Sequence, residues 1–424
     1  MREYVKRLPQ EVQDLIRLAG SVSGKNNMTA YLVGGFVRDL ILGVKNLDLD
    51  IVVEGDGIRF AEDLASALKA KLIRHRRFNT ATIVLKHSLK IDIATARSET
   101  YPYSASLPEV TAGSLNEDLA RRDFTINAMA ISINSRDFGR SIDVFQGNSD
   151  LKNKKIRVLH DLSFIDDPTR ILRALRFSTR YSFEIEPRTL RLLRDALRKR
   201  MLEKVQPQRL RDEIILILKE SQPLKQIRQL RKVAGLSFIS PCLKLSAHKW
   251  AFLRSIETQV NWFKKKFPQR RTLDAWLIYF MGLLDSLDIN EVKSVCGRFV
   301  FRAGEEKRIS SYKKISRKFI SELSKNNIRP SRIFALLEPL SYEVIILIRA
   351  RYKYKNIQRH IADFLDIYNG MRIYISGHDL KGLGLTPGPR YQRIFTQVLN
   401  AKLNGSIKSK EEELSLIREL IKIP

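Results

Sequence analysis

Cysteine and long apolar runs are what this sequence has least of. It contains two cysteines, Cys242 and Cys296, and neither has a spacing typical of metal ligands. We expect both to be buried and reduced, as in intracellular proteins. No stretch approaches the roughly 18–20 apolar residues that a membrane-spanning helix requires, and the segment MREYVKRLPQEVQDLIRLAG lacks the continuous apolar core of a secretion signal. The sequence therefore predicts a cytoplasmic protein with no membrane partner.

Acidic residues are also few compared with basic ones. The 424 residues include 46 Asp and Glu against 76 Lys and Arg, which gives a formal net charge of +30. Such an excess favours a polyanionic partner such as nucleic acid. The alternative is a basic surface that only promotes solubility, but that role does not need so much self-repulsion.

Strand signals nearly vanish after about residue 143. Before that point we predict strands over about 30–33, 47–53, 71–75, 80–87 and 90–97, and helices over 36–42, 57–70 and 114–132. A loop is expected over about 98–113. After residue 143, amphipathic segments with a period of 3.6 residues follow one another, separated by proline-containing breaks. This order predicts an N-terminal α/β head followed by an all-helical remainder.

Two carboxylates lie two residues apart in the predicted strand of LDLDIVVEG. Asp48 and Asp50 would point to the same face of a strand, where they repel each other. Divalent cations between them would make this arrangement favourable, and all-oxygen ligands suit magnesium or manganese. Asp92, in KIDIATAR, would be a third carboxylate if its strand lies alongside. Taken alone, the pattern favours the alternative of a solvent-facing edge strand with two harmless acids.

Two further patterns point to phosphate binding. Gly34 and Gly35 follow a predicted strand and precede a helix that carries Arg38, so backbone N–H groups could approach phosphates there. In DLARRDFTINAMA, Arg122 and Asp123 lie in a predicted helix whose N-cap is Ser114. Arginine suits triphosphate oxygens and aspartate can accept from a ribose hydroxyl. A surface cluster of salt-bridged charges is the alternative.

Four of these motifs together resemble a known family. YLVGGFVRDLILG, LDLDIVVEG, DLARRDFTINAMA and FIDDPTRILRALRF occur in the order and spacing of the CCA-adding enzymes (tRNA nucleotidyltransferases) and bacterial poly(A) polymerases. The resemblance runs from about residue 30 to 220. The segment ISGHDLKGLGLTPGPRYQRIF resembles a tail found in a subset of tRNA nucleotidyltransferases.

The resemblance implies roles for individual residues. Asp48 and Asp50 would be catalytic and would hold two Mg²⁺ or Mn²⁺ ions, with Asp92 as a further ligand. The ions would align the 3′-hydroxyl of a primer with the α-phosphate of a nucleoside triphosphate. Nucleotide binding would involve Gly34, Gly35, Arg38, Arg122, Asp123 and Asn127.

The DDPTR motif would select the nucleotide. Pro168 suits the first position of a helix and Asp167 its N-cap, which places Asp167 and Arg170 on one face. Their acceptors and donors could read the Watson–Crick edge of a base, and the family uses this pair in place of a nucleic-acid template. Arg173 and Arg176 continue the row of arginines toward the phosphates or the ATP/CTP site. Arg209 and Glu213 are expected to brace the surrounding helices.

The resemblance also implies an organisation and a function. We predict a nucleotidyltransferase head with a small mixed sheet at 1–142, a helical neck at 143–220, a helical body at 221–330 and a tRNA-binding helical tail at 331–424. The expected reaction is addition of CMP, CMP and AMP from CTP and ATP to the 3′ end of tRNA. The basic runs NWFKKKFPQRR and IRARYKYKNIQRH are candidate contacts to the acceptor and T arms.

Three alternatives remain open. Within the family, the protein could be a poly(A) polymerase, or a partial enzyme that adds only A or only CC. Members restricted to CC are shortened between the catalytic strands and the RRD motif, whereas SETYPYSASLPEVTAG is present here. From another class, the protein could be an RNA-binding module that keeps the fold without catalysis, although the paired aspartates and the glycines argue against this.

Overall fold

The computed structural model describes residues 2–44, 48–85, 89–270 and 272–422. The chain forms two compact units, residues 1–238 and 239–424, which are described separately below. The four-part division into head, neck, body and tail stays a prediction. Leu47 and residues 86–87, which fall within predicted strands, lie outside the described residues.

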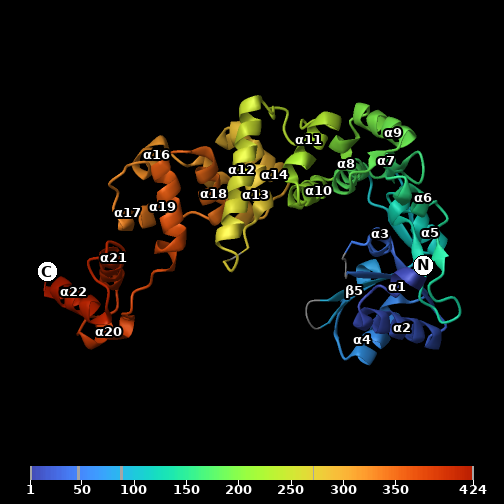
Figure 1. The fold of residues 1–424 in the computed structure, drawn as a ribbon, viewed down its shortest axis with the longest axis horizontal. Coiled ribbons are helices and arrows are strands. Elements are labelled where there is room, and N and C mark those ends of the chain that lie inside the picture. The colour runs from blue at the N-terminus through green and yellow to red at the C-terminus, as the bar shows by residue number, and fades with distance from the viewer. Residues whose placement is uncertain (1, 45–47, 86–88, 271, 423–424) are drawn as a thin grey trace. The chain divides into compact units, whose positions relative to one another are not determined.

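The first unit is built on a mixed sheet whose strand order is β3-β4-β5-β2-β1-β8-β9 (Figure 1). Only the β2–β5 pair is parallel among the pairs described in this sheet. The strands are β1 (Thr29–Val33), β2 (Leu49–Glu54), β3 (Lys71–His75), β4 (Thr80–Val84), β5 (Lys90–Thr95), β8 (Ala130–Ser132) and β9 (Ser141–Ile142). The α/β head expected from the sequence is confirmed.

Helices cover the sheet. They are α1 (Arg2–Val5), α2 (Gln10–Lys25), α3 (Gly34–Leu42), α4 (Gly57–Leu68) and α5 (Leu115–Ala120). Residues i and i+2 of a strand share a face, and Val52 packs with Leu115 and Leu119 of α5. Asp50, two residues before Val52, therefore belongs to the face that α5 covers.

Two local predictions around α5 are wrong. The predicted helix over 114–132 ends at Ala120, although its capping box between Ser114 and Glu117 is present. The apolar residues that follow form a short 3₁₀ helix and then β8, because pairing with β1 buries them in the sheet. The predicted loop over 98–113 contains a hairpin of β6 (Arg97–Thr100) and β7 (Glu109–Ala112).

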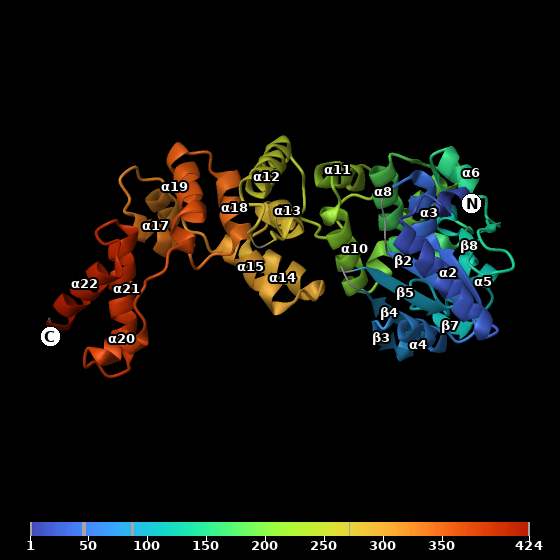
Figure 2. The same cartoon turned by 60° about the horizontal axis from the view of Figure 1, so that its bottom comes forward.

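The rest of the first unit is mainly helical, as predicted (Figure 2). Its helices are α6 (Gly147–Lys152), α7 (Ser163–Asp166), α8 (Thr169–Tyr181), α9 (Pro187–Arg198), α10 (Pro207–Lys219) and α11 (Pro223–Val233). A two-stranded parallel sheet of β10 (Lys155–Ile156) and β11 (Glu184–Ile185) is the remaining strand pair. Proline at the first position starts α9, α10 and α11, where its missing N–H costs no hydrogen bond.

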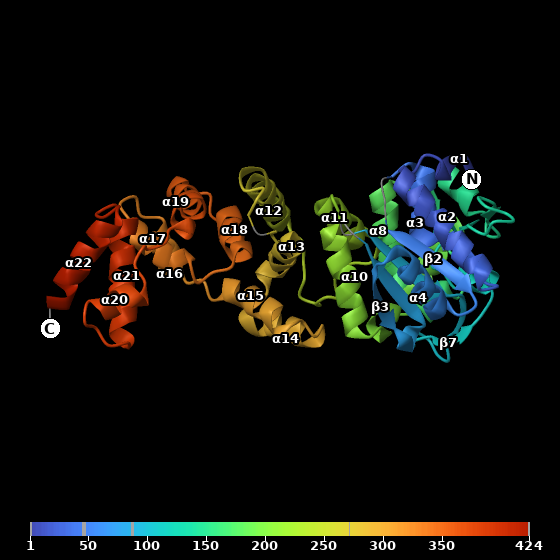
Figure 3. The same ribbon diagram turned by 90° about the horizontal axis from the view of Figure 1, so that it is seen from below.

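The second unit is all helical in its described part (Figure 3). It comprises α12 (Ala247–Lys266), α13 (Ala275–Leu283), α14 (Ile289–Arg298), α15 (Ala303–Lys313), α16 (Arg317–Leu323), α17 (Pro330–Leu337), α18 (Tyr342–Arg351), α19 (Lys355–Asp366), α20 (Gly377–Gly382), α21 (Pro389–Leu403) and α22 (Lys410–Lys422). The apolar run of α18 is fully buried, and α12 and α13 pack against it.

The two cysteines differ. Cys296 is buried as predicted, but Cys242 is exposed. Cys242 follows Pro241 in a turn before α12, where the chain runs over the surface. Within the described residues, no helix combines the length and the apolar character that crossing a membrane requires.

Candidate active site

Two of the predicted carboxylates lie side by side in the sheet. Asp50 of β2 and Asp92 of β5 are register partners in the parallel pair. Both line a hollow of about 350 Å³, together with Arg122, and the Oγ1 of Thr82 donates to Asp92 Oδ1 at 2.6 Å. Asp48 is exposed and lies just before β2 rather than within it. The condition under which Asp92 would be a third carboxylate, that its strand lies alongside the Asp50 strand, is met.

The electrostatics of this hollow penalise negative charge. Burial raises the pKa of Asp50 to about 6; Asp92 and Asp48 add to this rise, while Arg122 and Arg38 oppose it. Among the described residues, no three or more His, Cys, Asp or Glu side chains are gathered closely enough to hold a metal ion by themselves. The chemistry of the donors nonetheless fits a hard divalent cation, because carboxylate oxygens are the ligands that magnesium and manganese prefer.

Gly34 brings helix α3 close to this hollow. Its φ of +66° lies in the left-handed region that glycine tolerates. A Cβ at this position would lie 2.5 Å from Nη1 of Arg122 and 3.9 Å from Oδ2 of Asp50. The backbone conformation therefore favours glycine, and a larger residue would also displace the end of the Arg122 side chain.

One buried aspartate positions two arginines at the end of α5. Asp118 accepts from Nη2 of Arg121 at 2.6 Å and from Nη2 of Arg122 at 2.8 Å. Burial alone would raise the pKa of Asp118, but the two arginines hold it below its usual value. Arg121 also donates to Glu99 at 2.8 Å, which ties β6 to α5.

A second network joins three sequence motifs. Asp123 accepts from Arg173 at 2.7 and 2.8 Å and from Asn127 at 2.8 Å. Asn127 Oδ1 in turn accepts from Arg38 at 2.5 Å. Burial would raise the pKa of Asp123, but Arg173 outweighs it and the pKa is lowered. Asp123, Asn127 and Arg38 are thus linked to one another before any ligand binds.

Phe177 of α8 lies at the centre of the arginines. The guanidinium carbons of Arg38, Arg173 and Arg176 are 5.4, 5.3 and 4.8 Å from the centre of its ring. Phe124 meets the same ring edge-on, with centroids 5.9 Å apart. Cation–π attraction therefore adds to the ion pairs that orient these arginines.

The predicted base-reading pair is held by separate partners. Arg170 donates from Nη1 to Ser163 Oγ and from Nη2 to the carbonyl oxygen of Arg121, each at 2.7 Å. Asp167 accepts from the hydroxyl of Thr169 at 2.6 Å and from Arg209 at 2.8 Å. Helix α8 begins at Thr169, one residue later than predicted, so Pro168 and not Asp167 occupies its N-cap position. The Asp167 carboxylate still accepts from the Thr169 N–H at 3.1 Å.

The bracing role expected of Arg209 and Glu213 is visible in their contacts. Arg209 holds Asp167, and Glu213 accepts from Arg173 at 3.1 Å and from Arg176 at 3.3 Å. Arg176 is buried and also lies 3.6 Å from Glu220. It is therefore more fully paired than a solvent-facing phosphate contact would be.

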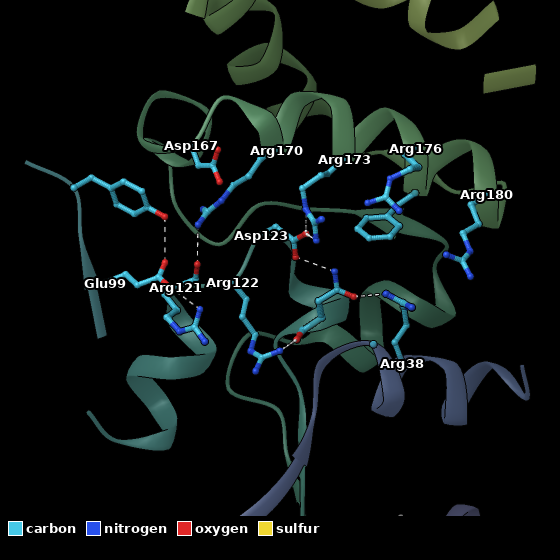
Figure 4. A pocket seen from close by; sticks show the side chains of 14 residues that line it. Arg38, Glu99, Arg121, Arg122, Asp123, Asp167, Arg170, Arg173, Arg176 and Arg180 are labelled. Atoms are coloured by element: carbon cyan, nitrogen blue, oxygen red, sulfur yellow. Dashed lines mark hydrogen bonds and ion pairs between the residues drawn. The ribbon is translucent and has the colours of Figure 1, made fainter. Parts of the chain in front are cut away.

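These residues surround one pocket of about 470 Å³ (Figure 4). All the nucleotide-binding predictions except Gly34 line it: Gly35, Arg38, Arg122, Asp123, Asn127, Asp167, Arg170, Arg173 and Arg176. Arg121 and Arg122 line both this pocket and the carboxylate hollow, so the two spaces adjoin.

The predicted nucleotide-binding residues leave out five that line the pocket, of which one, Arg121, lies in the DLARRDFTINAMA motif. Glu99 and Tyr101 come from the segment interpreted as a loop, and Phe177 and Arg180 from α8. Phe177 follows Arg173 by four residues and Arg180 follows Arg176 by four, so helical spacing could have identified both. Burial, with smaller contributions that include Glu99, raises the pKa of Tyr101 to about 12, so its hydroxyl keeps its proton.

A carboxylate hollow that adjoins an arginine-lined pocket is typical of enzymes that bind a nucleoside triphosphate and transfer its nucleotidyl group. Comparison with known proteins agrees. The family model described as the poly A polymerase head domain matches residues 30–157, and that of the probable RNA- and SrmB-binding site of polymerase A matches residues 182–245.

Relatives extend the match over the whole chain. An A-adding tRNA nucleotidyltransferase of Halalkalibacterium halodurans is 31% identical over 96% of this chain and 92% of its own length. One of Geobacter sulfurreducens is 36% identical over 97% of this chain. The chain belongs to the family of tRNA nucleotidyltransferases and poly(A) polymerases. It spans about half (47%) of the Geobacter relative.

Solved structures show the same fold. A CCA-adding enzyme in an apo form is 36% identical, with a TM-score of 0.75 over 98% of this chain and 97% of the other. The Thermotoga maritima CCA-adding enzyme in complex with tRNA is 35% identical, with a TM-score of 0.70 over 99% and 97%.

Proposed function

We propose that this protein adds CMP and AMP residues to the 3′ end of tRNA, from CTP and ATP, until the terminal CCA is complete. The observation that carries the proposal is the pocket in which Asp167 and Arg170 face a set of fixed arginines beside a carboxylate hollow. A base could be read by the pair while its phosphates extend over the arginines toward Asp50.

Asp48, Asp50 and Asp92 would hold the Mg²⁺ or Mn²⁺ on which we expect the reaction to depend, with the remaining ligands supplied by phosphate and water. When bound, the metal stabilises charge on the attacking and leaving oxygens. Arg122 and Asp50 both lie close to Gly34, the first residue of α3. Arg122 would therefore bind the phosphates where the hollow and the pocket meet. The primer 3′-hydroxyl would attack the α-phosphate, and pyrophosphate would leave.

Selection of the base would rest on Asp167 and Arg170. Arg209 and Thr169 hold the aspartate, and Ser163 and a main-chain oxygen hold the arginine. Because these partners fix both side chains before the nucleotide binds, a base with the wrong pattern of donors and acceptors would lose hydrogen bonds to these charged groups, each worth about 1.5–3 kcal/mol.

tRNA is the proposed primer because solved relatives at about 35% identity include one in complex with tRNA. Other structures of CCA-adding enzymes at 36% and 35% identity hold ATP and CTP. The net charge of +30 is consistent with such a polyanionic partner.

Addition of AMP alone is the second candidate, since the Geobacter and Halalkalibacterium relatives are named A-adding enzymes. The presence of the β6–β7 hairpin, which places Glu99 and Tyr101 in the pocket, argues against addition of CC alone. Poly(A) synthesis remains the third candidate.

One assay separates these reactions. The purified protein is given tRNA lacking its terminal CCA, tRNA ending in CC, or an unrelated RNA, each with CTP, ATP or both, plus Mg²⁺. We expect CTP and ATP to be added to the first substrate and addition to stop at CCA. Addition of a single A to tRNA ending in CC, with no nucleotide added to tRNA lacking CCA, would identify an A-adding enzyme. Long A tails on the unrelated RNA would identify a poly(A) polymerase.

A further inference from the structure

Tyr181, the last residue of α8, fastens this helix to α3. Its hydroxyl donates to Oδ1 of Asp39 at 3.2 Å. In a helix of about 3.6 residues per turn, position 181 lies on the same face as Arg170 and Arg173, which also donate to residues of the head. Base reading and phosphate binding account for the contacts of Arg170 and Arg173 but leave Tyr181 without a role.

The Asp39 oxygen that accepts from Tyr181 also accepts from Arg38. Nε and Nη2 of Arg38 each lie 2.8 Å from Oδ1 of Asp39. Both residues are buried, with Arg38 5% and Asp39 2% exposed. The remaining nitrogen, Nη1, donates to Oδ1 of Asn127 at 2.5 Å. Every nitrogen of the Arg38 guanidinium therefore has a partner, and one of these partners is shared with α8.

The ring of Tyr181 also contacts Arg38 directly. The guanidinium carbon of Arg38 lies 4.9 Å from the centre of this ring, and the Phe177 ring stacks on it with centroids 6.1 Å apart. Burial raises the pKa of Tyr181 to about 12, while Arg38 opposes this rise and Asp39 adds to it. The hydroxyl therefore keeps its proton and serves as a donor to Asp39.

Arg38 faces the nucleotide pocket. It reaches from α3 into the pocket, opposite the arginines of α8 (Figure 4). Its Nη2 lies 3.4 Å from the place of a Cβ on Gly35, so the guanidinium lies against the first turn of α3, where phosphate is attracted. Tyr181 is not one of the described residues that line the pocket. A role of Tyr181 in nucleotide binding would therefore pass through Arg38.

Loss of the Tyr181 hydroxyl would weaken phosphate binding in two ways. The Asp39 carboxylate would lose the contact that fixes it from α8, so Arg38 would be held less firmly. The carboxylate would also offset more of the positive charge of Arg38, because a donor on the same oxygen draws part of the negative charge away. Neither effect alters Asp167 or Arg170, which are held by other residues.

We propose that Tyr181 is a positioning residue for the triphosphate: through Asp39 it holds the Arg38 guanidinium toward the phosphates, and it takes no part in the choice of base. The proposal rests on the proposed function in that the pocket binds a nucleoside triphosphate. Helix α8 would then serve both parts of the nucleotide, the base at its start and the phosphates at its end.

The test is Tyr181→Phe in the full chain, which removes the hydroxyl and keeps the ring. Calorimetry in Mg²⁺ measures the Kd of CTP and of inorganic tripolyphosphate, with thermal unfolding as a check on folding. We expect both Kd values to rise about 3- to 10-fold, as for one lost hydrogen bond. In assays with tRNA, KM for CTP and ATP should rise by the same factor, because kcat and the discrimination against other triphosphates do not depend on this hydroxyl.

A double variant shows whether the hydroxyl acts through Arg38. In the background of Arg38→Ala, Tyr181→Phe should change the Kd of tripolyphosphate by less than about 2-fold, because the guanidinium that it positions is absent. Equal losses with and without Arg38 would overturn the inference, since the tyrosine would then act on the fold in general.

Tyr312→Phe is the matched control. Tyr312 of the second unit likewise donates its hydroxyl to a carboxylate, Oδ1 of Asp285 at 3.0 Å. This variant should bind tripolyphosphate as the unaltered protein does. A loss as large as that of Tyr181→Phe, or no loss in Tyr181→Phe, would refute the positioning role.

Failure of the unaltered protein to add nucleotides to tRNA would overturn the proposed function instead. The calorimetry needs no turnover, so the proposed function and the role of Tyr181 can fail separately.

Discussion

Apart from Arg170, the arginines of the nucleotide pocket are paired with acids, whereas Arg349 of the second unit has uncharged partners. Arg173 binds Asp123 and Glu213, and Arg121 binds Asp118 and Glu99. Arg349, in contrast, is held by two glutamines and an indole ring. An acid fixes the position of a guanidinium but lowers the net charge of the site. An amide fixes the guanidinium and leaves the net charge of the site unchanged.

This difference separates two tasks. A site that must distinguish one base from another needs donors in fixed positions more than it needs net charge. A site that holds any phosphate backbone needs net charge more than fixed positions. Substitutions in the first unit test the need for donors in fixed positions.

Removal of a carboxylate should have the largest effect. We expect Asp50→Ala to slow nucleotide addition at least about 1,000-fold, because the metal supplies several kcal/mol of transition-state stabilisation. Single-turnover assays with end-labelled tRNA measure the rate. Affinity for tRNA should stay nearly unchanged, and turnover close to that of the unaltered protein would contradict the metal-binding role.

The same aspartate should destabilise the metal-free fold. The pKa of Asp50 is raised from 3.8 to about 6, so the folded state holds its proton more tightly than the unfolded chain does. Stability therefore falls as the pH rises from about 4 to about 6, by at most about 3 kcal/mol. We expect Asp50→Asn to be more stable than the unaltered protein at pH 8 in EDTA.

Denaturant unfolding at several pH values measures this difference. It should become small near pH 4 and vanish below it, where the carboxyl is protonated in both states, and it should shrink at pH 8 when Mg²⁺ is added. A difference that is the same at pH 4 and pH 8 would show that ionisation of Asp50 is not its cause.

Loss of the guanidinium fork should relax the choice of nucleotide. Arg170→Lys keeps the charge but loses the two-pronged contact to Ser163 and the carbonyl of Arg121. We expect discrimination between CTP or ATP and the other two triphosphates to fall about 10- to 100-fold, which corresponds to one charged hydrogen bond. Ratios of kcat/KM measure it.

Arg188→Lys is the matched control, because Arg188 is exposed on α9 and contacts Asp161. Discrimination that survives Arg170→Lys within about 2-fold would refute the base-reading role. Loss of tRNA binding without loss of discrimination would refute it as well.

The smallest effect is expected at Phe177. Phe177→Leu removes the ring beneath three arginines, each worth about 0.5–1 kcal/mol of cation–π attraction. We expect KM for both triphosphates to rise about 3- to 10-fold, with Phe177→Tyr restoring it. Phe183→Leu, which loses a similarly buried ring that packs on Tyr181, is the control for lost packing.

The sequence was sufficient for the elements whose signals are local. The N-cap at Ser114 and the end of helix α3 before Gly43, whose φ is +68°, lie where predicted. The α/β head and helical remainder are likewise confirmed, because alternation and a 3.6-residue period report burial directly.

Long-range contacts decided the rest. The run after Ala120 is apolar enough for helix or strand, and only pairing with β1 makes it β8. The sequence at 97–112 has no clear apolar alternation, so the hairpin there could not be predicted. Glu99 enters the pocket because Arg121 and Arg97 hold it. Arg176 was expected near the phosphates, but its partners Glu213 and Glu220 lie 37 and 44 residues further on, beyond what spacing can reveal.

The contact from Arg170 to the carbonyl of Arg121 has a consequence for evolution. A main-chain oxygen is present whatever residue occupies position 121, so substitutions there cannot remove this acceptor. Insertion or deletion of a residue between Ser114 and Arg121 would displace it, because α5 is anchored by its cap at Ser114. Selection on this part of the nucleotide pocket would therefore act on the length of the segment rather than on the identity of the residue.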